Sequence, residues 1–147
     1  MPLLILGWSM DTVNALKLLG EPAIIVAAHR RVPRFTKLLS PPQWRIPVED
    51  HSSAECVLLA LERLPSTVRV DAVHTSDEFS LVTAALLART MEVPGPDLAV
   101  SCLFRDKVMQ KSALRKAGIP VADWRELDGT MDDMAVSCDS LGYPLVI

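Results

Sequence analysis

The chain has 147 residues, of which 50% are apolar and 22% are charged, and its formal net charge at pH 7 is −3. This composition excludes an intrinsically disordered chain, and the slightly acidic balance argues against general nucleic-acid binding, which requires a basic face. No apolar run approaches the roughly 20 residues that cross a bilayer, and the N-terminus lacks a signal-sequence pattern, so we expect a cytoplasmic protein without a membrane partner.

The first part of the chain alternates strands with helices, the pattern of an α/β protein. Apolar runs predict four strands, at residues 3–6, 23–27, 45–48 and 70–74. Helical periodicity predicts three helices, over residues 10–19, 54–64 and 78–91. Pro47 lacks an amide hydrogen, which places the third strand at an edge. The predicted fold is a Rossmann-like open parallel sheet of four or five strands.

The second part begins after the break at Pro94-Gly95-Pro96. Its pattern predicts a short helix, a capped helix, a strand, another capped helix and the start of a strand, at residues 97–104, 106–117, 121–127, 130–141 and 143–147. We therefore divide the chain into a Rossmann-like domain, residues 1–96, and a helical connector with an incomplete β-α-β unit, residues 97–147. The apolar end, Leu145–Ile147, predicts a strand whose partners are missing, hence a fragment of a longer protein and an unpaired edge suited to a homodimer.

Two predicted loops are candidates for a substrate site. In open parallel sheets, ligands bind outside the carboxyl ends of the strands, where the strand order switches. The residues at two such ends are Gly7, Trp8 and Ser9 after the first strand, and Thr75, Ser76, Asp77 and Glu78 after the fourth. Their hydroxyls, amides and carboxylates suit an amine or another polar small molecule. Simple helix capping by Ser76 or Asp77 is an equally weighted alternative.

A dinucleotide site is a competing interpretation. The first turn offers only Gly7 and lacks the three glycines of the usual phosphate-binding fingerprint. Arg30 and Arg31 follow the second strand, where basic residues hold the 2′-phosphate of NADP in some Rossmann domains. A solvated basic loop explains the same two residues.

The histidines and cysteines give no second site. His51 and His74 are isolated in the sequence, and His74 is expected to be a hydrogen-bonded core residue of a buried strand. The three cysteines are separated too widely for a zinc site and fall in apolar helical patterns, as expected of buried, reduced thiols; they are Cys56, Cys102 and Cys138.

Lys107 occupies an electrostatically unfavourable position. It follows the capping residue Asp106 in the first turn of a helix, where the helix dipole disfavours a cation. A negatively charged ligand or a carboxylate partner would account for this placement, and a solvated surface lysine is the alternative.

Four segments of the second part together resemble the junction of ATP-grasp enzymes. These are Pro94-Gly95-Pro96, Asp106-Lys107, Ala117-Gly118-Ile119-Pro120, and the closing LGYPLVI from Leu141 to Ile147. The strand and helix that flank Asp77 and Glu78 also resemble the family's pre-ATP-grasp domain. The resemblance covers nearly the whole chain and implies that residues 97–147 lead into an ATP-grasp subdomain.

The resemblance implies a parent ligase that uses ATP and magnesium to activate a carboxylate as an acyl-phosphate for an amine, a thiol or a carbanion. It implies that Lys107 contacts ATP phosphates and that Glu78 touches the acceptor substrate, while the other nucleotide and metal ligands lie beyond Ile147. We therefore expect no catalytic or metal-binding residue, no bound cofactor and no catalysis in the 147-residue chain itself. The alternatives are a stand-alone small-molecule binding or regulatory module and the NADP-binding Rossmann domain.

Overall fold

The computed structural model describes residues 2–29, 43–127 and 130–145. Contacts divide the chain into two units, Met1–Arg105 and Asp106–Ile147, and each is described by itself. The sequence pattern predicted this division after Pro96. The contacts place it after Arg105, because helix α5 (Leu98–Arg105) packs on helix α4 (Leu81–Thr90) of the first unit.

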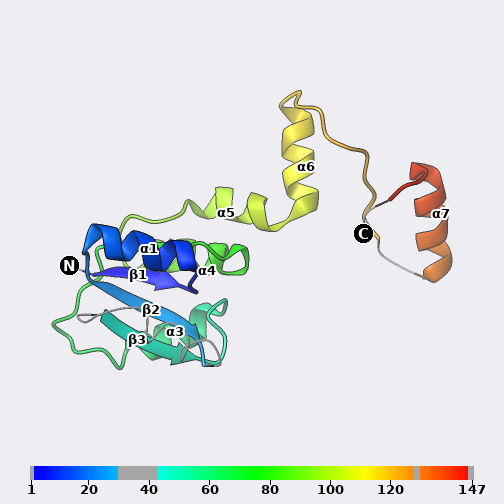
Figure 1. Ribbon diagram of the computed structural model, residues 1–147. Coiled ribbons are helices and arrows are strands. Elements are labelled where there is room, and N and C mark those ends of the chain that lie inside the picture. Colours follow the sequence, from blue (N-terminus) through cyan, green and yellow to red (C-terminus); the bar gives the residue numbers. More distant parts are fainter. Residues whose placement is uncertain (1, 30–42, 128–129, 146–147) are drawn as a thin grey trace. The chain divides into compact units, whose positions relative to one another are not determined.

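The first unit is built on a four-stranded sheet in the order β3-β2-β1-β4, and all its pairs are parallel. Figure 1 shows β1, β2 and β3 of this sheet. The strands are β1 (Leu3–Leu6), β2 (Ala23–Ala28), β3 (Gln43–Val48) and β4 (Ala72–Thr75). The α/β prediction is confirmed, and Pro47 lies on an edge strand as expected. The chain runs outward from β1 to β3 and then returns to the other side of β1, so the strand order switches between β1 and β4.

Helices cover the two faces of this sheet. Helix α1 (Met10–Leu19) packs Val13 and Leu16 against Ile5 and Ile25 on one face. On the other face, α3 (Ala54–Leu61) and α4 form the larger cluster with side chains of the alternate strand positions, among them Leu4, Leu6, Ile24 and Val26. Strand β2 is buried along its whole length, which explains its uninterrupted apolar sequence.

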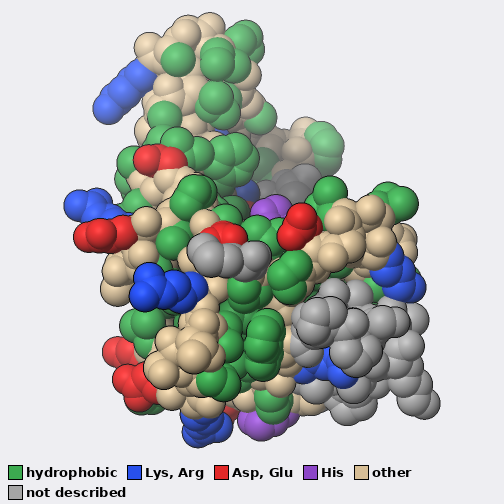
Figure 2. All heavy atoms as spheres, turned by 90° about the vertical axis from the view of Figure 1, so that its left-hand side faces the viewer, with side chains coloured by type: hydrophobic (Ala, Val, Ile, Leu, Met, Phe, Trp, Pro, Cys, Tyr) green, Lys and Arg blue, Asp and Glu red, His purple; other side chains and the backbone are tan. Residues whose placement is uncertain are grey.

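The predicted helices are present with altered ends. Helix α1 has the predicted bounds, whereas α3 ends at Leu61 and α4 is preceded by a 3₁₀ turn, η1 (Glu78–Ser80). The cysteines are only partly buried, so the prediction of buried thiols is wrong. The face drawn in Figure 2 shows apolar side chains at the surface between charged ones. Within the described ranges, no helix is both long and apolar enough to cross a membrane.

The second unit contains α6 (Lys107–Lys116) and α7 (Met131–Leu141). The strand predicted over residues 121–127 is wrong, since this segment has no regular secondary structure. A strand requires a hydrogen-bonded neighbour, and the described part of this unit contains none. The predicted strand at the C-terminus is not formed at Leu145, and Val146 and Ile147 lie outside the described residues.

Candidate functional site

The carboxyl ends of β1 and β4 bring the two predicted loops together. Leu6 and Thr75 are paired in the ladder between these strands. The buried Thr75 hydroxyl donates a hydrogen bond of 2.9 Å to the Leu6 carbonyl oxygen and accepts one of 3.0 Å from the Asp77 amide. The loop that contains Gly7, Trp8 and Ser9 therefore lies beside the loop that contains Ser76, Asp77 and Glu78.

Three hydroxyl groups form a chain between the loops. The Ser9 Oγ lies 2.9 Å from the Thr12 Oγ1, which lies 3.2 Å from the Ser76 Oγ. Ser9 also caps α1 by accepting a hydrogen bond from the Thr12 amide. Thr12 was not predicted as a site residue, although its position three residues after the capping serine is one where a polar side chain returns to the start of a helix.

This chain of hydroxyls borders an open cavity of about 390 Å³, which we call the hydroxyl pocket. Its lining residues are Ser9, Asp11, Thr12, Ala15, His74 and Ser76. The expectation that His74 is a core residue is wrong, because its side chain is exposed. His74 pairs with the buried Ile5 of β1 in register, but it lies on an edge strand where α1 leaves the surface open to the pocket.

Asp77 does not line the hydroxyl pocket, and both oxygens of its carboxylate have hydrogen-bond partners elsewhere. Its Oδ2 lies 2.8 Å from the Nε2 of His51, and its Oδ1 accepts a hydrogen bond of 3.1 Å from the Phe79 amide. The second bond is the capping role that the alternative interpretation predicted. The description of His51 as isolated is wrong, since the loop after β3 brings it to the end of β4.

Gly7 makes room for this pair. Its φ of 72° lies in the left-handed region, where glycine is favoured. A Cβ built on Gly7 would lie 3.2 Å from the Nε2 of His51 and 3.4 Å from the Cβ of Asp77. A side chain at this position would therefore be tight against the histidine and in ordinary contact with the aspartate.

The other predicted residues of the first unit lie around this centre. Trp8 is partly buried and packs against the cluster beneath α1. Glu78 is exposed at the start of η1, and the next residue, Phe79, has the guanidinium carbon of Arg105 4.6 Å from its ring centroid. Arg30 and Arg31, on which the NADP interpretation depends, lie outside the described residues.

Lys107 lies in the second unit, at the predicted place. It is the first residue of α6, and the Asp106 Oδ1 accepts hydrogen bonds of 2.9 Å from the amides of Val108 and Met109. No group of three or more histidine, cysteine, aspartate or glutamate side chains that could hold a metal ion occurs in the described ranges.

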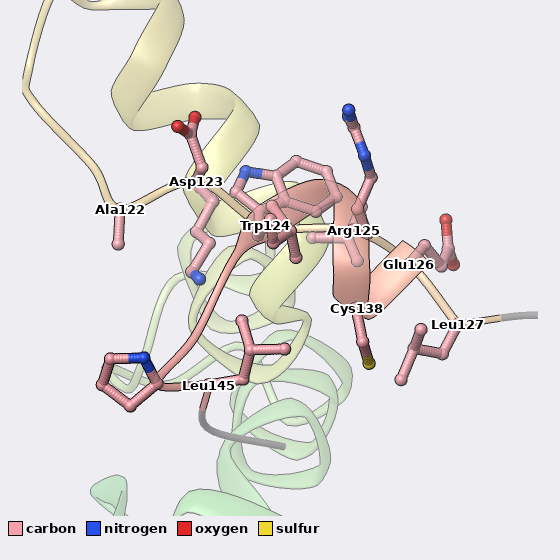
Figure 3. A pocket seen from close by; sticks show the side chains of 12 residues that line it. Ala122, Asp123, Trp124, Arg125, Glu126, Leu127, Cys138 and Leu145 are labelled. Atoms are coloured by element: carbon pink, nitrogen blue, oxygen red, sulfur yellow. The ribbon is translucent and has the colours of Figure 1, made fainter. Parts of the chain in front are cut away.

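A second cavity, of about 560 Å³, lies within the second unit between α6, α7 and the segment 122–127 (Figure 3). Trp124, Cys138 and Leu145 lie around it, and the Arg125 guanidinium points away. The indole Nε1 of Trp124 is buried without a hydrogen-bond partner in the described structure. This cavity was not anticipated from the sequence, because part of its lining, residues 122–127 and Leu145, comes from segments predicted to be regular strands.

Comparison with solved structures identifies the fold. A Rhizobium etli pyruvate carboxylase, the T882A variant with the allosteric activator acetyl coenzyme-A, matches 97% of this chain with a TM-score of 0.67 and 18% identity. The biotin carboxylase subunit of a pyruvate carboxylase matches 97% with a TM-score of 0.60 and 22% identity. Both are members of the ATP-grasp superfamily. The chain shares the fold of the matched part of these two carboxylases.

The comparison confirms the predicted resemblance at the level of the fold, including the α/β architecture of the pre-ATP-grasp region. The chain spans 15% of the length of the first structure and 33% of the second. No family model and no curated protein matches the sequence.

Proposed function

We propose that this chain is the N-terminal part of an ATP-dependent ligase that activates a carboxylate as an acyl-phosphate. The observation that carries the proposal is the fold likeness over 97% of the chain to a biotin carboxylase subunit, of which the chain spans 33%. The hydroxyl pocket supports it, because the pocket lies at the switch in strand order, where open α/β sheets bind ligands.

The hydroxyl pocket forms one wall of the substrate site in this proposal. Hydroxyl groups both donate and accept hydrogen bonds, so Ser9 and Ser76 can orient either a carboxylate or an amine. The exposed carboxylate of Asp11 adds a partner for an amine. Asp77 is engaged on both oxygens by His51 and Phe79, which leaves it a structural role in the wall.

Lys107 is proposed to contact the phosphates of ATP. A helix N-terminus attracts anions through its amide groups and dipole, but the Asp106 side chain already accepts hydrogen bonds from two of these amides in α6. A phosphate near this end would therefore depend on the ammonium group of Lys107 for its positive charge. ATP and magnesium are assigned to the complete ligase, where they supply the phosphoryl group and neutralise its charge.

The 147-residue chain itself is proposed to be inactive. Phosphoryl transfer depends on positioning and on neutralisation of charge by metal ions and cations. The described residues offer no carboxylate cluster for the metal. Nor is any described side chain of the second unit fully buried, which fits a segment that is completed by further protein.

The gene provides the first test, since the proposal requires the reading frame to continue beyond codon 147. The complete product should release ADP from ATP only when magnesium and a carboxylate substrate are present. Lys107→Gln should raise the KM for ATP about tenfold, the usual effect of losing a hydrogen bond to a charged group. Lys116→Gln, at the other end of the same helix, is the matched control and should leave this KM unchanged.

Two results would contradict the proposal. ATP turnover by the purified 147-residue chain would show that a complete site lies within it. A stop codon directly after Ile147 would favour the stand-alone binding module, which requires only the hydroxyl pocket of the first unit.

A further inference from the structure

We propose that His51 is a positioning residue of the hydroxyl pocket, which holds Asp77 through Nε2 and so fixes the place of the Ser76 hydroxyl. This role rests on the proposed function in one respect, because it assumes that the pocket receives a ligand. The placement of Ser76 itself can be tested without any ligand.

Three loops converge on the pair of His51 and Asp77. His51 comes from the loop after β3, Asp77 from the loop after β4 and Gly7 from the loop after β1. The Nε2 to Oδ2 distance is 2.8 Å, and the side chain of His51 is only 12% exposed. A Cβ added to Gly7 would lie within 3.4 Å of both partners, so the loop that also carries Ser9 lies beside the pair.

The turn that carries His51 is itself held by hydrogen bonds on two sides. The Ser80 hydroxyl donates a hydrogen bond of 3.4 Å to the His51 carbonyl oxygen, and the Thr83 hydroxyl donates to the carbonyl oxygen of Ser52. On the other side, Asp50 accepts hydrogen bonds from the Ser52 hydroxyl and amide, and these bonds hold the pKa of the Asp50 carboxyl below its ordinary value. The histidine is therefore presented by a fixed turn that is tied to α4.

Ser76 connects Asp77 to the hydroxyl pocket. Ser76 lies between Thr75, which is bonded to β1, and Asp77, which is bonded to His51. With both neighbours fixed, the Ser76 hydroxyl is directed to Thr12, 3.2 Å away. If the bond from His51 were lost, only the cap to Phe79 would hold the Asp77 carboxylate, and Ser76 would lose one of its two anchors.

The geometry also predicts the tautomer of His51. A carboxylate can only accept a hydrogen bond, so the nitrogen that faces Asp77 must carry the proton. In the neutral imidazole this nitrogen is Nε2. Long-range proton–nitrogen NMR spectra of the 147-residue chain at mildly alkaline pH should therefore show the Nε2–H form of His51.

A matched pair of substitutions tests the positioning role. The amide nitrogen of glutamine can take the place of Nε2, whereas that of asparagine is too short and corresponds to Nδ1. His51→Asn should accelerate hydrogen exchange of the Phe79 and Asp77 amides by about tenfold or more and should shift the Ser76 amide resonance. His51→Gln should leave both close to the parent chain.

Asp77→Asn provides an independent test that retains the imidazole. The NMR spectra show whether the imidazole keeps Nε2–H in this variant, since transfer of the proton to Nδ1 would let Nε2 accept from the NH₂ group. The asparagine keeps an acceptor for the Phe79 amide, but its NH₂ group cannot accept from Nε2–H. It should reproduce the effect of His51→Asn, and the double substitution should add nothing further. If His51→Asn does not fold, Asp77→Asn carries the test.

Three outcomes would overturn the inference. In the first, His51→Asn leaves the exchange rates and the Ser76 resonance unchanged. In the second, His51→Gln is as damaging as His51→Asn, which would assign the role to the shape of the imidazole. In the third, the effects of His51→Asn and Asp77→Asn are additive.

The consequence for the complete ligase is measured separately. There, His51→Asn should raise the KM for the acceptor substrate and leave the KM for ATP unchanged, and His51→Gln should restore the former. A chain that shows the NMR effects while its complete gene product lacks ligase activity would refute the proposed function and leave the positioning of Ser76 established. The role of His51 in binding would be refuted if the NMR effects are seen and the complete ligase is active, but His51→Asn leaves the KM for the acceptor substrate unchanged.

Discussion

Replacing Gly95 with alanine should destabilise the first unit by about 1–3 kcal/mol, the usual cost of forcing an extra methyl group into a packed site. A Cβ built on Gly95 would lie 2.4 Å from the Cβ of Ala88 and 3.2 Å from the carbonyl oxygen of Val73. Ordinary contacts begin near 3.4 Å, so relief requires a shift of about 1 Å. Gly95 does not have a positive φ, and the predicted cost is therefore steric alone.

The segment that would have to move supports the edge of the sheet. The Val73 amide donates a hydrogen bond of 2.8 Å to the Pro94 carbonyl oxygen, which ties the turn to the outer side of β4. A shift of Gly95 away from α4 would strain this bond. For a unit of this size, the midpoint of thermal unfolding should fall by about 5–20 °C, at about 4–8 °C for each kcal/mol.

The assay is thermal unfolding followed by circular dichroism, with Ala88→Gly as the rescuing substitution. Ala88→Gly alone should cost about 1 kcal/mol through the lower helix propensity of glycine. In the Gly95→Ala background it removes the atom that the new methyl group meets, so the double variant should be more stable than Gly95→Ala. Coupling of about 1 kcal/mol or more is expected for residues in such direct contact.

Gly20→Ala separates backbone strain from steric collision. Gly20 has a φ of 65°, and a Cβ added to it would meet no atom within 4 Å, so alanine there should cost only the left-handed backbone penalty. Ala88→Gly should not rescue it. The reasoning is refuted if Gly95→Ala lowers the midpoint by less than about 2 °C, a change well below the range that its steric cost predicts, or if the effects of Gly95→Ala and Ala88→Gly are additive.

Two further predictions concern hydrogen bonds at element ends. Thr75→Val should lower the free energy of unfolding, measured by urea denaturation, by about 1–3 kcal/mol, because the Leu6 carbonyl oxygen and the Asp77 amide lose the threonine hydroxyl as a partner. Thr75→Ser keeps a hydroxyl and should retain most of the stability of the parent chain. An equal loss of stability in both variants would contradict this prediction. The Thr130 hydroxyl and amide, which donate to Asp133, lower the pKa of that carboxyl. Because the folded-state pKa is lowered, the ionised carboxylate stabilises α7 at pH values above the unfolded pKa, and this stabilisation is lost as the pH falls below about 4. Helicity measured by circular dichroism should therefore decrease there in the parent chain. In Asp133→Asn the helicity should be insensitive to this step.

The sheet was predictable because strands that are buried on both faces have uninterrupted apolar sequences. Strand β2 is buried throughout and reads as an unbroken apolar run, and β1 is nearly so. The proline of β3 indicated an edge strand, because proline has no amide hydrogen to donate to a neighbouring strand in the middle of a sheet. Strand order then determined which loops meet, and the switch between β1 and β4 is where the hydroxyl pocket lies.

The contacts of individual polar residues were not predictable in this way. His51 and Asp77 are 26 residues apart, and their pairing depends on the conformation of the turn after β3, which leaves no periodic signal. His74 was expected to be buried because its neighbours are apolar. Its exposure follows from the edge position of β4 and from the limited reach of α1, both of which are properties of the whole sheet.

The second unit shows what local patterns leave undetermined. Residues 121–127 have a strand-like sequence but no neighbour to accept their hydrogen bonds, and no described side chain around them is fully buried. The described side chains of these two helices are at most partly buried, so the helices gain little of the free energy that offsets the conformational entropy of an ordered chain. Val136 and Tyr143 remain 70% and 74% exposed, and Trp124 lines a cavity of about 560 Å³. These features are expected of a unit whose core is completed by other protein surfaces.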